Sequence, residues 1–205
     1  MFNDLENLFR FDKTNIHLAG KVAARAYFEA DDFSYSPKDS SKQMKFLTKL
    51  MNLTFRISLK FGKVYAPTKN IEGVAAWLPH DKINLSTWHY IRNGALSLVI
   101  GSGKGGLKKL IQYGNLASKK HKEHADFPHI YLYNLAIDPS HQGKGYASRL
   151  LKPMFTRLDE ANLHCYLESH ERNQSLYEHF GFDVVERISR PEYDYDMLLM
   201  LRNNK

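Results

Sequence analysis

The sequence predicts an α/β fold in one domain, residues 1–205. Strand-like runs alternate with helical segments in the C-terminal half, which is typical of an α/β sheet. The last two runs have no helix between them and are expected to pair antiparallel. A chain of 205 residues with 43% apolar and 25% charged residues has the size and composition of one globular domain.

The N-terminal elements follow from hydrophobic periodicity. Residues 14–28 carry apolar side chains at three- and four-residue spacing, which predicts an amphipathic helix. A second such pattern covers residues 41–61, and Gly62 is expected to end that helix. Two strand-like runs follow within residues 63–80, separated by the polar stretch 69–73, and this arrangement predicts an antiparallel hairpin.

The remaining elements are divided by a segment of different character. Residues 81–128 are helical in pattern, basic and punctuated by glycine, and we interpret them as a helical insertion between the third and fourth strands. The elements expected after it are a strand, a glycine-containing loop with a helix, a strand, a short helix and two final strands, at 129–137, 145–158, 164–169, 174–180, 183–188 and 194–201.

Charge and cysteine content restrict the class of protein. Lys and Arg outnumber Asp and Glu by 29 to 22, a formal charge of +7. The basic residues are spread along the chain without the interleaved aromatic residues of a base-stacking surface, so we expect no nucleic-acid partner. Cys165 cannot form an internal disulfide and is interpreted as a small core residue. With no secretory signal and no apolar run of membrane-spanning length, a cytoplasmic location without membrane association is predicted.

Two stretches contain Gly-Lys-Gly, and only the second has the context of a phosphate site. The first, "GSGKGG" at 101–106, lacks the Walker A spacing and is interpreted as a glycine-rich stop between helical segments. The second, "QGKGYA" at 142–147, lies between an apolar strand and an amphipathic helix. Unpaired N–H groups and the positive end of the helix dipole meet there, which favours binding of a phosphate.

This context resembles the GNAT superfamily of acetyl-CoA-dependent N-acetyltransferases. Gln142, Gly145 and Ala147 match the pyrophosphate-loop pattern Gln/Arg-x-x-Gly-x-Gly/Ala of that family. "YLYNLAID" before the loop, "CYLESHERNQSLYEHFGF" after its helix and "VYAPTKNIEGVAAWLP" upstream also resemble it. Within the superfamily the combination is most similar to the puromycin N-acetyltransferase-like branch. The resemblance implies a GNAT-like mixed, mostly antiparallel central sheet flanked by helices.

The resemblance also implies acetyl-CoA as the cofactor and assigns residues to it. The pyrophosphate would be held by backbone N–H groups of Gln142, Gly143, Lys144, Gly145, Tyr146 and Ala147. The Lys144 side chain could reach a phosphate or simply be solvated. Main-chain groups of Leu135, Ala136 and Ile137 would pair with the pantetheine arm, since the family's strand before the loop splays from its neighbour.

Catalytic roles are implied in the same way. Tyr177 stands where the family keeps the general acid that protonates the leaving thiolate, although tyrosines on short helices are usually packing residues. Asn173 would cap the helix that contains Tyr177, bond the cofactor arm, or do both. Glu168 is the first candidate for the base that neutralises the attacking amine. The alternatives are His170, Glu29 and the pair Asp31 and Asp32. No cluster of His, Cys, Asp and Glu has metal-site spacing, so no metal is expected.

The function predicted from these residues is transfer of the acetyl group of acetyl-CoA to a primary amine of a small molecule. The resemblance implies direct attack in a ternary complex, without an acyl-enzyme. The rival hypotheses are a protein or peptide N-acetyltransferase and a non-catalytic CoA-binding regulatory module. The N-terminal helices, the insertion and the closing strands are expected to select the acceptor.

Overall fold

In the computed structural model, which describes residues 4–30, 37–83, 91–95, 98, 103–190 and 195–204, seven strands form one sheet. Their spatial order is β1-β2-β3-β4-β5-β7-β6. The strands are β1 (Phe9–Arg10), β2 (Lys63–Ala66), β3 (Gly73–Pro79), β4 (His129–Ile137), β5 (His164–His170), β6 (Asp183–Arg190) and β7 (Tyr195–Arg202). Within these ranges, β4 and β5 form the one parallel pair and all other neighbours are antiparallel. The mixed, mostly antiparallel sheet is therefore confirmed.

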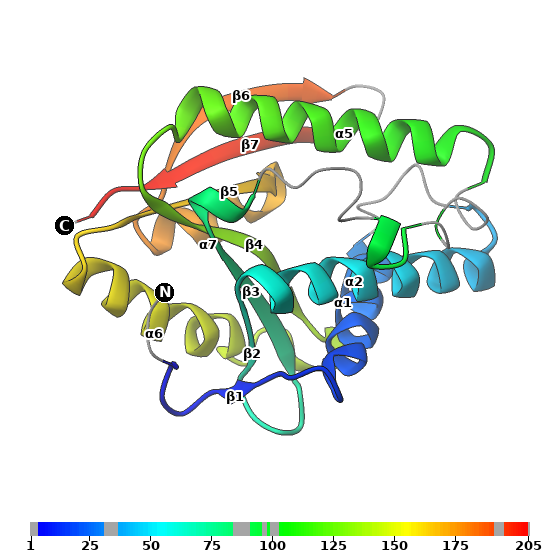
Figure 1. The fold of residues 1–205 in the computed structure, drawn as a ribbon, viewed down its shortest axis with the longest axis horizontal. Helices are drawn as coiled ribbons and strands as arrows, with labels where there is room; N and C mark the ends of the chain where they lie inside the picture. The colour runs from blue at the N-terminus through cyan, green and yellow to red at the C-terminus, as the bar shows by residue number, and fades with distance from the viewer. Residues whose placement is uncertain are drawn as a thin grey trace.

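Helices cover both faces of this sheet (Figure 1). The α-helices are α1 (Ile16–Ala30), α2 (Ser40–Phe61), α5 (Gly103–His124), α6 (Tyr146–Glu160) and α7 (Gln174–His179). Short 3-10 turns lie at His80–Lys82, Pro139–His141 and Glu171–Asn173. Helices α1, α2 and α5 pack on one face, and α6 and α7 pack on the other. Within the described ranges, every helix is too short or too polar to serve as a membrane span.

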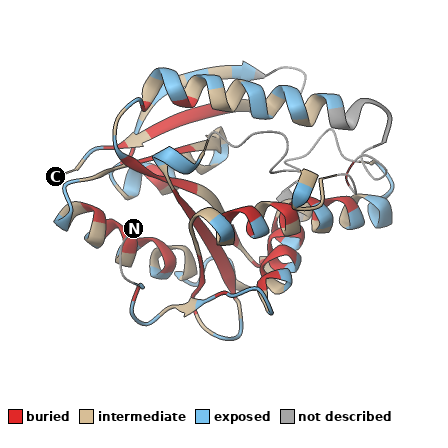
Figure 2. Cartoon of the chain, in the orientation of Figure 1, coloured by how far each residue is buried: buried red, intermediate tan, exposed pale blue. Residues whose placement is uncertain are grey.

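Two apolar layers hold the helices to the sheet, and the strands between them are the most buried part of the chain (Figure 2). Alternate residues of β3 show why: Val74, Ala76 and Leu78 point toward α1, α2 and α5, whereas Ala75 and Trp77 point toward α6. A strand buried on both faces must be apolar along its whole length. The uninterrupted apolar run of β3 follows from its central place.

The predicted helices and hairpin are confirmed with small changes in their bounds. Helix α2 begins after Asp39, whose side chain accepts a hydrogen bond from the Lys42 N–H at 2.9 Å. It ends at Gly62, whose N–H donates to the Ser58 carbonyl at 2.7 Å, as the glycine predicted. The insertion between the third and fourth strands is also confirmed, since α5 lies between β3 and β4.

Two features differ from the expectations. Strand β1 was not identified in the sequence, because a two-residue pairing of Phe9 and Arg10 with Ala66 and Tyr65 leaves no alternating pattern to detect. The first Gly-Lys-Gly is not wholly a helix stop, since α5 begins at Gly103 and contains the stretch. Residues 101 and 102 lie outside the described ranges. The tertiary setting of α5 overrides the low helix propensity of its glycines.

Candidate active site

Strands β4 and β5 pair at one end only. Their register joins His129 to His164, Ile130 to Cys165 and Tyr131 to Tyr166, and the pairing stops there. Strand β4 continues to Ile137 while paired with β3 on its other side. Residues 132–137 therefore face β5 without a ladder, among the described residues, and the two strands enclose a wedge. This is the splay that the family resemblance implied.

The loop at the carboxyl end of β4 carries the predicted glycines in a strained conformation. Gly143 and Gly145 have φ angles of 73° and 78°, a region that residues with a β-carbon adopt at a cost. A β-carbon at either position would meet no atom within 4 Å. The protein's own packing therefore does not require glycine there. Open space in front of the backbone is what an approaching ligand would need.

Donor groups gather at this loop. Gly145 is the N-cap of α6, and no side chain caps the helix. Within the described part of the chain, the N–H groups of Gly143, Lys144 and Gly145 have no hydrogen-bond acceptor. The first N–H groups of a helix lack partners inside the helix. All six residues of 142–147 thus lie at one donor-rich, largely exposed point that suits an anion.

The side chains of this loop fold back onto the loop itself. Lys144 Nζ donates to the Ser140 carbonyl at 2.8 Å, and Gln142 Nε2 donates to the Ile137 carbonyl at 3.3 Å. Both bonds stabilise the turn between β4 and α6. In this structure the Lys144 ammonium group therefore supports the loop's shape, and the donors that face outward belong to the backbone.

Asp138 anchors the loop to α1. Its Oδ1 accepts hydrogen bonds from the Ser140 hydroxyl at 2.7 Å and the Ser140 N–H at 3.1 Å. Its Oδ2 accepts from Arg25 Nε at 2.8 Å. Burial raises the pKa of this carboxyl group, but the hydrogen bonds from Ser140 and Arg25 outweigh burial and lower it. Asp138 is thus a charged tether between the loop and α1.

A cavity of about 460 Å³ lies beside this tether. It is bounded by α1, the turn between β2 and β3, and the 3-10 turn that precedes the glycine loop. Its lining includes Lys21, Arg25, Asn70, Asp138, Ser140 and His141. The surface next to the glycine loop is therefore hollowed, and it combines these polar groups with the apolar side chains of Leu18, Val22 and Ile71.

The predicted pantetheine segment lies in the unpaired part of β4. Leu135 and Ile137 pack toward α6, while Ala136 is buried against the α1–α2 layer. The Leu135 carbonyl accepts a hydrogen bond from the Tyr27 hydroxyl of α1 at 3.4 Å. The structure therefore brings these residues and the glycine loop together along one strand.

The predicted acid, Tyr177, lies on α7, the helix that follows β5. Tyr177 is 7% exposed, on α7, with its ring edge-on to Phe182 at 5.7 Å. Asn173 occupies the N-cap position of α7, but its side chain makes no capping hydrogen bond, so this one of the two alternatives for the residue is not observed. Its Nδ2 instead donates to the Ser169 hydroxyl at 3.3 Å, because the 3-10 turn before α7 points the amide back toward β5.

Glu168 lies on strand β5, and its side chain is half-buried. The Tyr131 hydroxyl donates a hydrogen bond to its Oε2. Its Oε1 is out of contact with solvent and has no partner among the described residues. Burial raises the pKa of Glu168 to about 7, while the Tyr131 and Tyr166 hydroxyls act in the opposite direction. A carboxyl group that titrates near neutrality can serve as a base or an acid.

The alternative bases have other surroundings. His170 Nδ1 accepts a hydrogen bond from the Arg172 N–H at 3.1 Å, which caps a 3-10 turn. Burial, with the Arg172 charge, lowers the pKa of His170. The Glu29 side chain and residues Asp31 and Asp32 lie outside the described residues. Of the candidate bases described, Glu168 is the one whose pKa is moved toward neutrality.

Sequence reasoning missed the aromatic surroundings of Glu168. Tyr131, Tyr166 and Leu199 belong to one cluster with residues of α5. Part of the signal was present in the sequence, because Tyr166 and Glu168 are two residues apart and so lie on the same face of one strand. The missing information was the register, which the alternating pattern of either strand alone does not fix.

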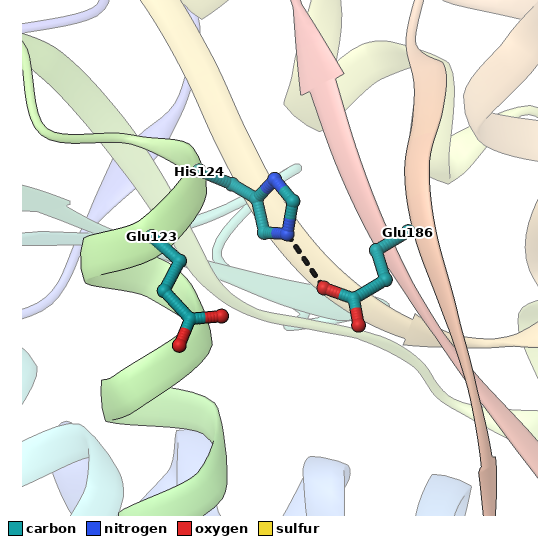
Figure 3. Close-up of side chains that lie close together, drawn as sticks. All are labelled: Glu123, His124 and Glu186. Carbon is teal, nitrogen blue, oxygen red and sulfur yellow. Dashed lines mark hydrogen bonds and ion pairs between the residues drawn. The ribbon is translucent and has the colours of Figure 1, made fainter.

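A second polar group lies between α5 and β6. Donor atoms of Glu123, His124 and Glu186 lie within 4.8 Å of one another and could hold a metal ion (Figure 3). His124 Nε2 is 2.6 Å from Glu186 Oε2, and Lys120 Nζ is 2.8 Å from Glu186 Oε1 and 2.9 Å from Glu123 Oε2. Lys120 already pairs with both carboxylates, so the group acts as a link between α5 and β6.

Cys165 is the small core residue that the sequence predicted. Its side chain is fully buried, and burial raises the pKa of the thiol well above its ordinary value. A thiol that stays protonated is a poor nucleophile.

Comparison with known proteins identifies the family of this chain. Residues 72–182 match the Acetyltransferase (GNAT) family model. Over 75 residues the chain is 37% identical to a Schizosaccharomyces pombe protein described as an uncharacterized N-acetyltransferase, a match that covers 35% of this chain and 30% of that protein. The chain thus spans under a third of that curated relative's length.

Solved structures show the same fold over nearly the whole chain. The chain superposes on a Corynebacterium glutamicum structure described as histone acetyltransferase HPA2 and related acetyltransferase, with TM-score 0.68 and 22% identity over 97% of this chain and 96% of that one. It also superposes on the C-terminal condensation domain of Ebony in complex with beta-alanyl-dopamine, with TM-score 0.63, 6% identity and coverage of 96% and 97%. At these identities the likeness concerns the fold.

Proposed function

Because the chain belongs to the GNAT family of acetyltransferases, whose members use acetyl-CoA as the acetyl donor, we propose that it is an N-acetyltransferase acting on a primary amine of a small molecule. The transfer would occur by direct attack in a ternary complex. The sequence resemblance to the puromycin N-acetyltransferase-like branch supports a small acceptor. The observation that carries the proposal is the open glycine loop at the mouth of the β4–β5 wedge.

The residues of this loop fit the cofactor. Unpaired N–H groups at 143–145 and the N-terminus of α6 would hold the pyrophosphate, and the unpaired edge of β4 at 135–137 would accept the pantetheine arm. When bound, acetyl-CoA supplies an activated thioester. A polyanionic cofactor also agrees with the chain's charge of +7.

Glu168 is the proposed base. An amine that enters as an ammonium ion must lose a proton before its nitrogen can attack a carbonyl carbon. A carboxylate whose pKa is raised to about 7 by burial is ionised in part at neutral pH and still basic enough to take that proton. Its Oε2 already accepts from Tyr131, whereas Oε1 is buried and has no partner among the described residues.

Tyr177 is the proposed acid. As the carbon–nitrogen bond forms and the carbon–sulfur bond breaks, the sulfur leaves as a thiolate that needs a proton. A phenol hydroxyl is protonated at neutral pH and can donate it. Tyr177 lies on α7, which follows β5, and packs on the α6 side of the sheet, whereas Tyr131, the partner of Glu168, packs on the α5 side.

The test is thiol release from acetyl-CoA with a panel of small primary amines and a panel of peptides of matched amine concentration. We expect turnover with one or more small amines and little with peptides. Preference for peptides would replace the small-molecule assignment with protein N-acetylation. Tight CoA binding without turnover on either panel would leave a non-catalytic binding module.

A further inference from the structure

Only one oxygen of the Glu168 carboxylate accepts a hydrogen bond from the described residues. Its Oε2 accepts the Tyr131 hydroxyl from β4, the neighbouring strand. The Tyr166 hydroxyl, two residues back on β5, lies close enough to affect the same carboxyl group. It does not reach hydrogen-bonding geometry, and Tyr166 Oη and Glu168 Oε1 are both buried without a partner among the described residues. Tyr131 is thus the residue that fixes how the carboxylate is turned.

The Tyr131 ring is itself fixed from α5. The His121 ring of α5 stacks on it, with centroids 5.3 Å apart and planes 19° from parallel. His121 Nε2 is 2.8 Å from His129 Nε2, and His129 Nδ1 is 2.8 Å from the Phe127 carbonyl. If His129 donates to that carbonyl, it accepts from His121, and both rings are neutral. Burial lowers the pKa of each histidine, which agrees with this arrangement.

We propose that Tyr131 is a positioning residue, which holds Oε2 of Glu168 and so fixes the orientation of the carboxylate, and that α5 secures Tyr131 through His121. The inference rests on the proposed base role of Glu168 and extends it to the insertion. In this arrangement a helix without a place in the catalytic chemistry controls the orientation of the base.

The hydrogen bond also affects when Glu168 is ionised. A hydroxyl that donates to a carboxylate favours its charged form, so the bond opposes the effect of burial. The polar groups near this carboxyl and its tyrosine neighbours come from four elements: Tyr131 and Tyr133 on β4, Tyr166 on β5, Tyr113 and His121 on α5, and Glu186 on β6. On β7, the residue opposite Glu168 is the apolar Leu199. Removal of the Tyr131 hydroxyl should therefore raise the pKa of Glu168.

The experiment is a carbon NMR titration of protein labelled at the glutamate carboxyl carbons, with Glu168→Gln used to identify the signal. Tyr131→Phe keeps the ring and removes one oxygen, and we expect the titration midpoint of Glu168 to rise by about one pH unit. Tyr65→Phe is the matched control. It removes another buried tyrosine hydroxyl, which bonds the Leu5 N–H and Asp4 instead, and should leave the midpoint in place.

A second measurement needs no substitution at Tyr131. In the parent protein labelled at the tyrosine ring carbon that bears the hydroxyl, the Tyr131 signal should change with the same midpoint as the Glu168 carboxyl. An unchanged midpoint in Tyr131→Phe, or a Tyr131 signal that ignores the ionisation of Glu168, overturns the inference. A larger shift in Tyr166→Phe than in Tyr131→Phe would also overturn it.

These outcomes are separate from those of the proposed function. If Glu168→Gln retains full turnover, Glu168 is not the base, whatever the titrations give. If Glu168→Gln loses turnover while Tyr131→Phe leaves the midpoint unmoved, the base role stands and the positioning role of Tyr131 falls.

Discussion

The glycine loop at 142–147 and the carboxylate site around Glu168 are built in opposite ways. The loop is exposed, and its outward-facing donors are backbone N–H groups whose arrangement depends on two left-handed glycines. The carboxylate site is enclosed, and its parts are side chains from β4, β5 and α5. One is made by local chain geometry and the other by tertiary packing. Substitutions should therefore act on binding at the first and on chemistry at the second.

Glu168→Gln should have the largest effect, a loss of turnover of about 1,000-fold. The amide is close in shape to the carboxyl group but cannot accept the amine's proton. Coenzyme A affinity, measured by calorimetric titration, should stay within about twofold because the loop is untouched. A loss of affinity as large as the loss of turnover would show that the two regions are not independent.

Gly145→Val should have the next largest effect, a fall in coenzyme A affinity of about 100-fold. The left-handed backbone at Gly145 disfavours a branched side chain, and the added atoms would fill the space in front of the unpaired N–H groups. Calorimetric titration measures the change.

The control for that substitution is Gly114→Ala on α5. Gly114 also has open space at the position of a β-carbon, but it lies in the helical interior, where alanine is stabilising by about 1 kcal/mol. The Gly114→Ala variant should bind coenzyme A with the same affinity as the parent protein. Equal losses in both variants would mean that the effect is not specific to the loop.

Tyr177→Phe should reduce turnover by about 30-fold with coenzyme A binding retained. The effect should be smaller than for Glu168 because a thiolate leaves more readily than an amine would. Steady-state thiol release with a saturating amine measures it. Unchanged turnover would mean that Tyr177 is a packing residue only, in agreement with its ring contact with Phe182.

The last expected effect is on the pH dependence of stability rather than on turnover or binding. Burial raises the pKa of Glu168 from 4.5 in the unfolded chain to about 7, so between these values the native state holds a proton that the unfolded state has lost. The stability contributed by this group is present below pH 4.5 and is lost as the pH rises through 7. Relative to the parent, Glu168→Gln should gain at most about 1.4 kcal/mol per pH unit across that window.

Urea unfolding of the parent and Glu168→Gln at several pH values across this window measures the difference. A difference in unfolding free energy that does not change with pH would mean that Glu168 titrates as it does in the unfolded chain. The conclusion that the Glu168 carboxylate is enclosed would then be wrong.

The glycine loop could be predicted from the sequence more fully than the carboxylate site. The loop, the helix after it and the strand before it were all predicted, because Gly143 and Gly145 mark a conformation that few other residues adopt. Glu168 was placed near the end of a strand by the alternating pattern, and Tyr177 was placed in a short helix by the family resemblance. These features depend on neighbours in sequence.

The surroundings of Glu168 could not be predicted in the same way. Tyr131 lies 37 positions before Glu168, and the contact depends on the parallel register between β4 and β5. His121 contacts Tyr131 only because α5 crosses that face of the sheet. The apolar residues of the insertion are irregularly spaced, so the sequence did not show which face of this helix packs on the sheet.

The short register between β4 and β5 has a mechanical consequence. Three residue pairs join the two halves of the sheet along their backbones, and beyond them the halves are connected by packed side chains. A pantetheine arm seated along β4, as proposed, would act as a substitute strand and close this seam. Amide hydrogens at 132–137 should then exchange slowly with solvent when coenzyme A is bound and faster in its absence, so that supply of the cofactor would govern the rigidity of the enzyme as well as its activity.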